Sequence, residues 1–247
     1  MWVAILAAIG LESGAAAAEW PHHREIGRFV CRADFPLETV ETLLADLQQL
    51  QADLTADLGL PAANEWIELY LFRDKPTYLG YMSKQFPGVP YRRALYMKSR
   101  GQGRVFAYLG PEVETDVRHE CTHALLHAVL PMVPLWLDEG LAEYYEVPRA
   151  NRKQDRSRPW NPGGTRRPLP TLVELEAKRD VSEMGLDEYH AAWTWAYFML
   201  HGPAEARGEL LQFLEDIRAQ TPPGQLSVRL RTRLPDLDDR YAAFRRG

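Results

Sequence analysis

Residues 119–146 of this chain read HECTHALLHAVLPMVPLWLDEGLAEYYE. Two apolar, helix-forming segments flank a turn at residues 131–134, which contains two prolines. Because proline interrupts helices, the pattern predicts two antiparallel helices joined by a short connection. The first should have Pro111 as its first residue, followed by acidic residues that favour the start of a helix, and should end at Leu130. The second should cover residues 135–146.

The first helix carries the sequence His119-Glu120-Cys121-Thr122-His123. Histidines four residues apart lie on one face of a helix, so both imidazoles can reach one metal ion while Glu120 leans over the same site. Cys121 lies on the opposite, apolar side of the helical wheel, and we interpret it as a packing residue rather than a ligand. His127 is assigned to the helix surface or to a hydrogen-bonded core position, with the cleft wall as the alternative.

A catalytic zinc ion usually takes three protein ligands. A third histidine in the spacing H-E-x-x-H-x-x-G-x-x-H is missing, because Leu126 and Val129 stand at the required positions. Glu139 offers the alternative. The first helix rises ~10 Å beyond His123 and the second descends ~7 Å to Glu139, so antiparallel packing returns this carboxylate nearly to the height of His123.

This segment resembles the gluzincins, the peptidase MA-like zinc metallopeptidases. The similarity spans residues 119–146 and is most specific in WLDEGLAEYYE, residues 136–146. The segments YRRA (91–94) and VFAY (105–108) look like a bacterial branch of that superfamily classed as domains of unknown function.

The resemblance implies one zinc ion held by His119, His123 and Glu139. It also implies that Glu120 is the catalytic base, taking a proton from zinc-activated water and passing it to the leaving amine. The expected reaction is hydrolysis of peptide bonds in a peptide or protein substrate, with another amide, such as one in cell-wall peptide, as a variant. The alternative from another class is a non-catalytic zinc-binding or scaffolding module with the same fold.

Gluzincins commonly supply a Tyr or a His from the C-terminal helical region to stabilise the oxyanion. We choose Tyr189 for this role, with His190 beside it. Tyr189 also belongs to a row of residues spaced by four, Tyr189, Trp193, Tyr197 and His201, which an ordinary packing stripe would explain equally well.

Two carboxylates are candidates to orient the imidazoles. Glu143 lies one turn beyond Glu139, and we expect it to accept the free N–H of His119. Asp138 would do the same for His123. A solvated helix carboxylate is the alternative interpretation of Glu143.

The rest of the chain predicts an α+β fold. A small mixed-sheet lobe at residues 24–110 precedes the active-site helix at the junction and a helical lobe at 111–247, all within one catalytic domain, residues 19–247. Strands are predicted at 26–31, 66–72, 94–98 and 105–109, and helices at 37–58, 75–86, 172–179, 187–201 and 205–220. We expect substrate to lie in the cleft, added as a strand to a sheet edge at 105–109.

Residues 149–170 are rich in Arg, Pro, Gly and Asn and predict a long loop. Its arginines are typical of a solvated segment, and a lid or a patch for acidic substrates is the alternative.

The 247 residues include 29 Lys+Arg, 34 Asp+Glu and two Cys, for a net charge of −5. This balance gives no basic footprint for nucleic acid, and two distant cysteines cannot form a disulfide framework or a thiolate zinc site. The apolar run at 2–11 and the alanines at 15–18 predict a signal peptide over 1–18, whose start would lie upstream because Lys and Arg are missing there. A plain N-terminal helix is the alternative.

Export predicts a periplasmic or extracellular enzyme without stable membrane insertion after the signal peptide is removed. His22 and His23 are expected in a mobile terminus next to the cleavage site.

Overall fold

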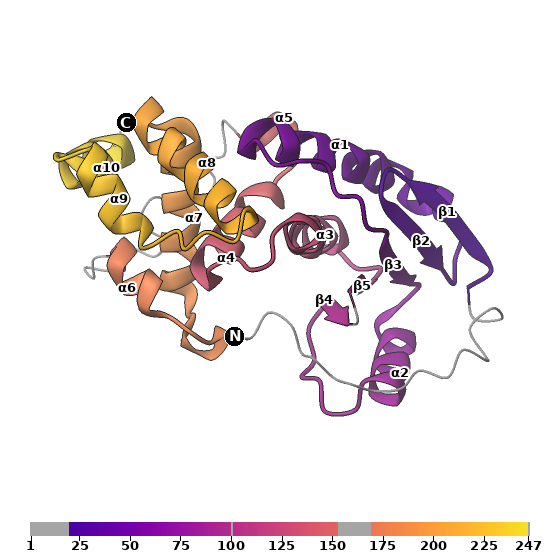
Figure 1. The fold of residues 1–247 in the computed structure, drawn as a ribbon. Helices are drawn as coiled ribbons and strands as arrows, with labels where there is room; N and C mark the ends of the chain where they lie inside the picture. The colour runs from indigo at the N-terminus through magenta and orange to yellow at the C-terminus, as the bar shows by residue number, and fades with distance from the viewer. Residues whose placement is uncertain (1–19, 100, 153–168, 247) are drawn as a thin grey trace.

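The computed structural model describes residues 20–99, 101–152 and 169–246 (Figure 1). The predicted α+β class is confirmed: five strands form one mixed sheet before residue 109, and helices dominate the part that follows. The predicted signal peptide and most of the predicted loop at 149–170 lie outside the described residues. Within the described part, every helix is too short or too polar to cross a bilayer.

The sheet has the strand order β1-β2-β3-β5-β4. Strands β2, β3 and β5 run parallel, while β1 and β4 are antiparallel edge strands. The prediction that residues 105–109 form a sheet edge is therefore wrong, because β5 lies between β3 and β4. The free edge beside the helical lobe belongs to β4. The strands are β1 (His22–Ile26), β2 (Phe29–Ala33), β3 (Ile67–Phe72), β4 (Ala94–Ser99) and β5 (Gln102–Tyr108).

The first predicted strand, residues 26–31, is a hairpin instead. Gly27 has a positive φ of 56°, a conformation that glycine adopts without steric cost, and the chain reverses there. Strand β1 begins at His22 and pairs with β2, so His22 and His23 lie in an edge strand and not in a mobile terminus.

Helices cover both faces of the sheet (Figure 1). On one face lie α1 (Glu41–Leu58), which follows a short 3₁₀ helix at Leu37–Val40, and α3 (Val113–Val129). Helix α1 buries a row of leucines and ends at Gly59, whose φ is 64°. On the other face, α2 (Lys75–Gln85) packs over an aromatic cluster around Phe72 and Phe106. The alternation of each strand thus divides the apolar side chains between two layers.

The helical lobe packs against α3, and its predicted helices are confirmed with small shifts at their ends. The C-terminal helices α9 and α10 were not predicted, and residues 149–152 form a short helix where a loop was expected. The elements are α4 (Leu135–Tyr145), α5 (Arg149–Arg152), α6 (Leu172–Ala177), a 3₁₀ helix at Val181–Glu183, α7 (Leu186–His201), α8 (Ala204–Arg218), α9 (Leu226–Arg233) and α10 (Leu237–Arg246).

Helix α5 ties this lobe to α1. Arg149 and Arg152 both bind the carboxylate of Asp53, which is buried. These two arginines therefore have a structural role, in contrast to the solvated or substrate-recruiting roles considered for the loop.

Gly140 allows α4 and α7 to approach closely. A Cβ at this position would lie 2.4 Å from the backbone oxygen of Ala192, so the two helix backbones are in direct contact. Since Glu139 is its neighbour, this contact also determines where that carboxylate lies.

We expect Gly140→Ala to lower the free energy of unfolding by about 3 kcal/mol, because one of the two helices must move. Gly208→Ala is the matched control: Gly208 lies in α8, and no atom of the described residues lies within 4 Å of its Cβ position. Alanine there should stabilise the protein by about 0.5–1 kcal/mol. Urea unfolding of both variants checks this prediction. Equal stability of the two variants would contradict the close contact.

Candidate metal centre

Helices α3 and α4 pack side by side (Figure 1). The buried side chain of Arg118 holds them in place: its Nε donates to the backbone oxygen of Glu146 at 2.6 Å, and its Nη1 donates to Asp46 of α1 at 3.2 Å. The end of α4 is thereby fixed next to the first half of α3.

Three potential ligand atoms meet between these helices. His119 Nε2 lies 3.2 Å from His123 Nε2 and 3.5 Å from Glu139 Oε2, and His123 Nε2 lies 3.8 Å from the same oxygen. A tetrahedral ion with ligands at about 2.0–2.2 Å needs its ligand atoms about 3.3–3.6 Å apart. The three residues predicted as ligands therefore form a group that could hold one metal ion after very small adjustments.

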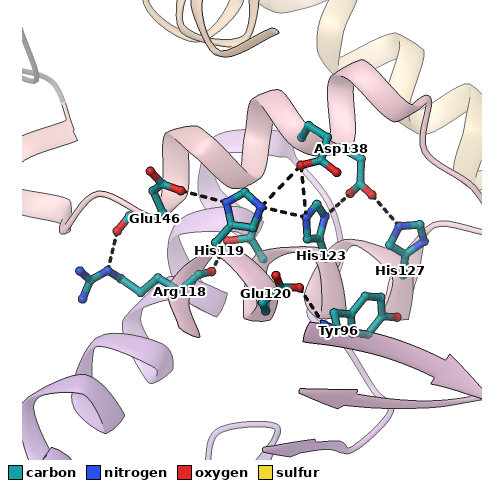
Figure 2. Close-up of polar contacts among 10 residues, drawn as sticks. Tyr96, Arg118, His119, Glu120, His123, His127, Asp138 and Glu146 are labelled. Atoms are coloured by element: carbon teal, nitrogen blue, oxygen red, sulfur yellow. Dashed lines mark hydrogen bonds and ion pairs between the residues drawn. The ribbon is translucent and has the colours of Figure 1, made fainter. Parts of the chain in front are cut away.

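The outer nitrogens of both imidazoles face carboxylates (Figure 2). Asp138 is the partner expected for His123: its Oδ1 lies 3.0 Å from His123 Nδ1, as an ion pair outside hydrogen-bond geometry. Asp138 Oδ2 lies 2.9 Å from His127 Nε2. Asp138 is completely buried between the two rings. Both outer nitrogens thus lie within 3.0 Å of a carboxylate oxygen, and the Nε2 atoms are left to face a metal.

The expected partner of His119 needs a correction. His119 Nδ1 lies 2.9 Å from Glu146 Oε2, whereas Glu143 was predicted to accept this N–H. Glu146 follows Glu139 by two helical turns and lies at the end of α4, beside the first half of α3. Glu143 instead lines the adjoining cavity.

The charges around these rings favour a bound cation. Burial by itself lowers the pKa of His123, but the carboxylates of Asp138 and Glu139 raise it to about 9. Burial opposes charge at His119 too, and hydrogen bonds to Glu139 and Glu146 raise its pKa well above the ordinary value. Asp138 shows the reverse: burial would raise its pKa, but His123 and His127 lower it. A metal ion entering this group would displace protons from the imidazoles.

Glu120 lies beside the three ligand atoms and is oriented by the edge strand. Its Oε2 accepts a hydrogen bond of 2.7 Å from the backbone N–H of Tyr96 in β4 (Figure 2). The ring of Tyr96 is buried and stacks on His127, with 5.8 Å between ring centroids. Tyr96 thus positions the carboxylate of Glu120 through its backbone and packs through its ring on His127, the other partner of Asp138.

A cavity of about 690 Å³ adjoins the three ligand atoms and is also lined by Glu120 and Tyr189. Tyr189, at the start of α7, is half-buried; burial and the charges of Glu139 and Glu120 raise its pKa to about 12. The phenol therefore keeps its proton at neutral pH and can donate it in a hydrogen bond. His190, the other candidate, is buried against Trp193 and does not line the cavity.

A second group of potential ligands shares one histidine with the first. His119, Glu143 and Glu146 also bring three ligand atoms within 4.8 Å of one another. Its members are more exposed than those of the first group, and Glu146 already faces the outer nitrogen of His119. Mutation of one carboxylate from each group distinguishes the two.

Cys121 and His127 both have structural roles. Cys121 is completely buried, and burial raises the pKa of its thiol, so the packing interpretation is confirmed. His127 has the hydrogen-bonded role and does not line the cavity. Sequence reasoning missed Arg118 and Tyr96, since a buried arginine and a backbone N–H carry no local signal. The acidic residue that ends α4, Glu146, was visible in the sequence.

Comparison of the chain with models of known protein families found no match, and comparison with curated proteins found none either.

Proposed function

We propose that the protein is a zinc-dependent metallopeptidase of the gluzincin type that hydrolyses peptide bonds. The observation that carries the proposal is the meeting of His119 Nε2, His123 Nε2 and Glu139 Oε2 within 3.2–3.8 Å of one another, with Glu120 beside them. Two imidazoles and one carboxylate are a ligand set typical of catalytic zinc. When bound, zinc supplies a Lewis acid that polarises a carbonyl and lowers the pKa of water.

The hydrogen bond of Glu120 to the edge strand supports the role of general base. One carboxylate oxygen is held by the backbone of β4, which leaves the other able to take a proton from attacking water. The same oxygen can later return the proton to the leaving amine. Because Tyr96 N–H fixes the carboxylate, little reorganisation is needed when substrate binds.

The edge of β4 offers a binding surface for a peptide. The N–H of Tyr96 points to Glu120 and so away from β5. Main-chain groups alternate along an antiparallel pair, so those of Ala94 and Lys98 face the same free edge. An extended substrate can add there as a further strand next to the cavity.

Tyr189 is the donor that we propose for the negative charge developing on the scissile carbonyl oxygen. It lines the cavity with the ligand group and keeps its proton at neutral pH. Tyr189→Phe should therefore lower kcat about 100-fold with a much smaller change in KM, because the lost hydrogen bond acts mainly in the transition state. Steady-state kinetics check this. An unchanged kcat would leave Tyr189 as a packing residue only.

Digestion of a broad peptide library tests the proposed function. The protein is stripped with a chelator, reloaded with one equivalent of zinc and compared with the metal-free form by mass spectrometry. We expect new peptide termini with the zinc-loaded protein and none with the metal-free protein. Stoichiometric zinc without cleavage of any peptide would instead support the non-catalytic module.

A further inference from the structure

The cavity extends to one side of the three ligand atoms. Its lining residues in α3 all come from the first part of that helix, Thr115 to His123, and those in α4 from the second part, Glu139 to Glu146. Residues just before β4, including Arg92, form the wall at this end. A bound substrate would therefore make most of its contacts on that side of the reacting bond.

The direction of β4 tells which part of a substrate lies there. Strand β4 and helix α3 run in the same direction, because residues further along the strand contact residues further along the helix. The hydrogen bonds join Arg93 to Asp116 (2.8 Å), Tyr96 to Glu120 (2.7 Å) and Lys98 to His127 (2.6 Å). A peptide paired antiparallel with β4 runs the opposite way. Its residues on the C-terminal side of the scissile bond then lie next to Arg92.

Arg92 differs from the other charged residues of this wall. It is exposed, and it makes no hydrogen bond or ion pair with any residue that the structure describes. Its neighbour Arg93 is bound to Asp116. Within the described residues, the acidic side chains of the cavity all have interaction partners: Asp116, Glu120, Glu139, Glu143, Glu146 and Asp180.

Arg92 also interacts electrostatically with Tyr189. The positive charge of Arg92 lowers the pKa of Tyr189, against the larger effect of burial, which raises it. A group bound by Arg92 would accordingly lie near the proposed oxyanion donor.

We propose that Arg92 determines specificity by binding a carboxylate that the substrate carries on the C-terminal side of the scissile bond. The carboxylate is either the side chain of Asp or Glu or the free C-terminus of the peptide. A guanidinium binds both through paired, charge-assisted hydrogen bonds. This inference rests on the proposed function for its scissile bond, but the binding of the carboxylate can be measured without turnover.

Binding is measured with zinc-loaded Glu120→Gln protein, which should leave peptides intact. Three kinds of fluorescent peptide share one neutral sequence. The Glu peptides form a series with a single Glu at each position in turn and an amidated C-terminus. The free-acid peptide has Gln and a free C-terminus, and the neutral peptide has Gln and an amidated C-terminus. We expect the Glu peptide or the free-acid peptide to bind about 10-fold more tightly than the neutral one by fluorescence anisotropy. The comparison identifies the source of the carboxylate.

Adding Arg92→Gln should remove this preference, and adding Arg92→Glu should reverse it in favour of a peptide with Lys. Arg240→Gln is the matched control, since Arg240 is an exposed arginine of α10 whose ion-pair partner among the described residues is Asp236. Equal affinity for all three peptides, failure of the acidic peptides to bind, or a preference that survives Arg92→Gln would overturn the proposal.

Cleavage by the wild-type protein adds the direction: the acidic group should lie on the C-terminal side of each cut, and an acidic group confined to the N-terminal side would overturn the proposal. Arg92-dependent binding without cleavage would contradict the proposed function and leave the carboxylate site standing. Cleavage that does not depend on Arg92 would support the proposed function and overturn the carboxylate site.

Discussion

Replacing Glu120 with glutamine should lower turnover at least about 100-fold while one zinc ion per chain remains bound. Glutamine has the same shape and its oxygen can still accept the hydrogen bond from Tyr96 N–H. It cannot take a proton from water, however, and so cannot act as the base. The three ligand atoms belong to other residues, which is why the metal should stay.

Glu114→Gln is a suitable control for this variant. Glu114 lies in the same helix and loses the same charge, but its side chain is 54% exposed and it does not line the cavity. We expect its turnover to stay within about twofold of the wild type. Undiminished turnover in Glu120→Gln would contradict the mechanism. Parallel loss of zinc and turnover in that variant would instead assign Glu120 to the metal shell.

Glu139→Gln should weaken zinc binding by more than about 100-fold, because even residues that only orient ligands contribute 10–100-fold to affinity. Glu143→Gln is the matched comparison. Glu143 lies one turn later in the same helix, lines the same cavity and undergoes the same change. Its zinc affinity should fall by less than about 10-fold. Competition with a chelating dye measures both affinities.

This pair of variants distinguishes the two groups of potential ligands. A large loss with Glu143→Gln and a small one with Glu139→Gln would place the metal on His119, Glu143 and Glu146. Thermal unfolding of the metal-free variants controls for misfolding, since Glu139 is buried and Glu143 is partly exposed.

The helices that carry the candidate site were predictable because their signals are local. Histidines four residues apart share a helix face wherever the helix packs, and Pro131 with Pro134 interrupts the chain between α3 and α4. The prediction that Glu139 approaches His123 required only the rise per residue of two antiparallel helices. The distances of 3.5 and 3.8 Å from Glu139 to the two histidines agree with that estimate.

Contacts between distant segments were harder to predict. Glu146, and not Glu143, reaches His119 because Arg118 holds the end of α4 against the first half of α3. That arrangement depends on how the two helices are packed, which their periodicity does not determine. Likewise, the order of β4 and β5 in the sheet follows from which strands pair, and the apolar residues of one segment do not specify its neighbour.

The C-terminal helices illustrate a third limit. Helices α9 and α10 are short and polar, so their intrinsic helix signal is weak. Packing on the rest of the lobe stabilises them: the ring of Tyr241 stacks on Trp195 of α7 with 3.8 Å between centroids. Such tertiary stabilisation cannot be read from the segment itself.

The most direct test of the proposed metal site is diffraction from zinc-loaded crystals, recorded on both sides of the zinc absorption edge. We expect one anomalous peak per chain, at about 2.0–2.2 Å from His119 Nε2, His123 Nε2 and a carboxylate oxygen of Glu139. A peak on Glu143 and Glu146, or the lack of any peak near His119 and His123, would contradict the assignment.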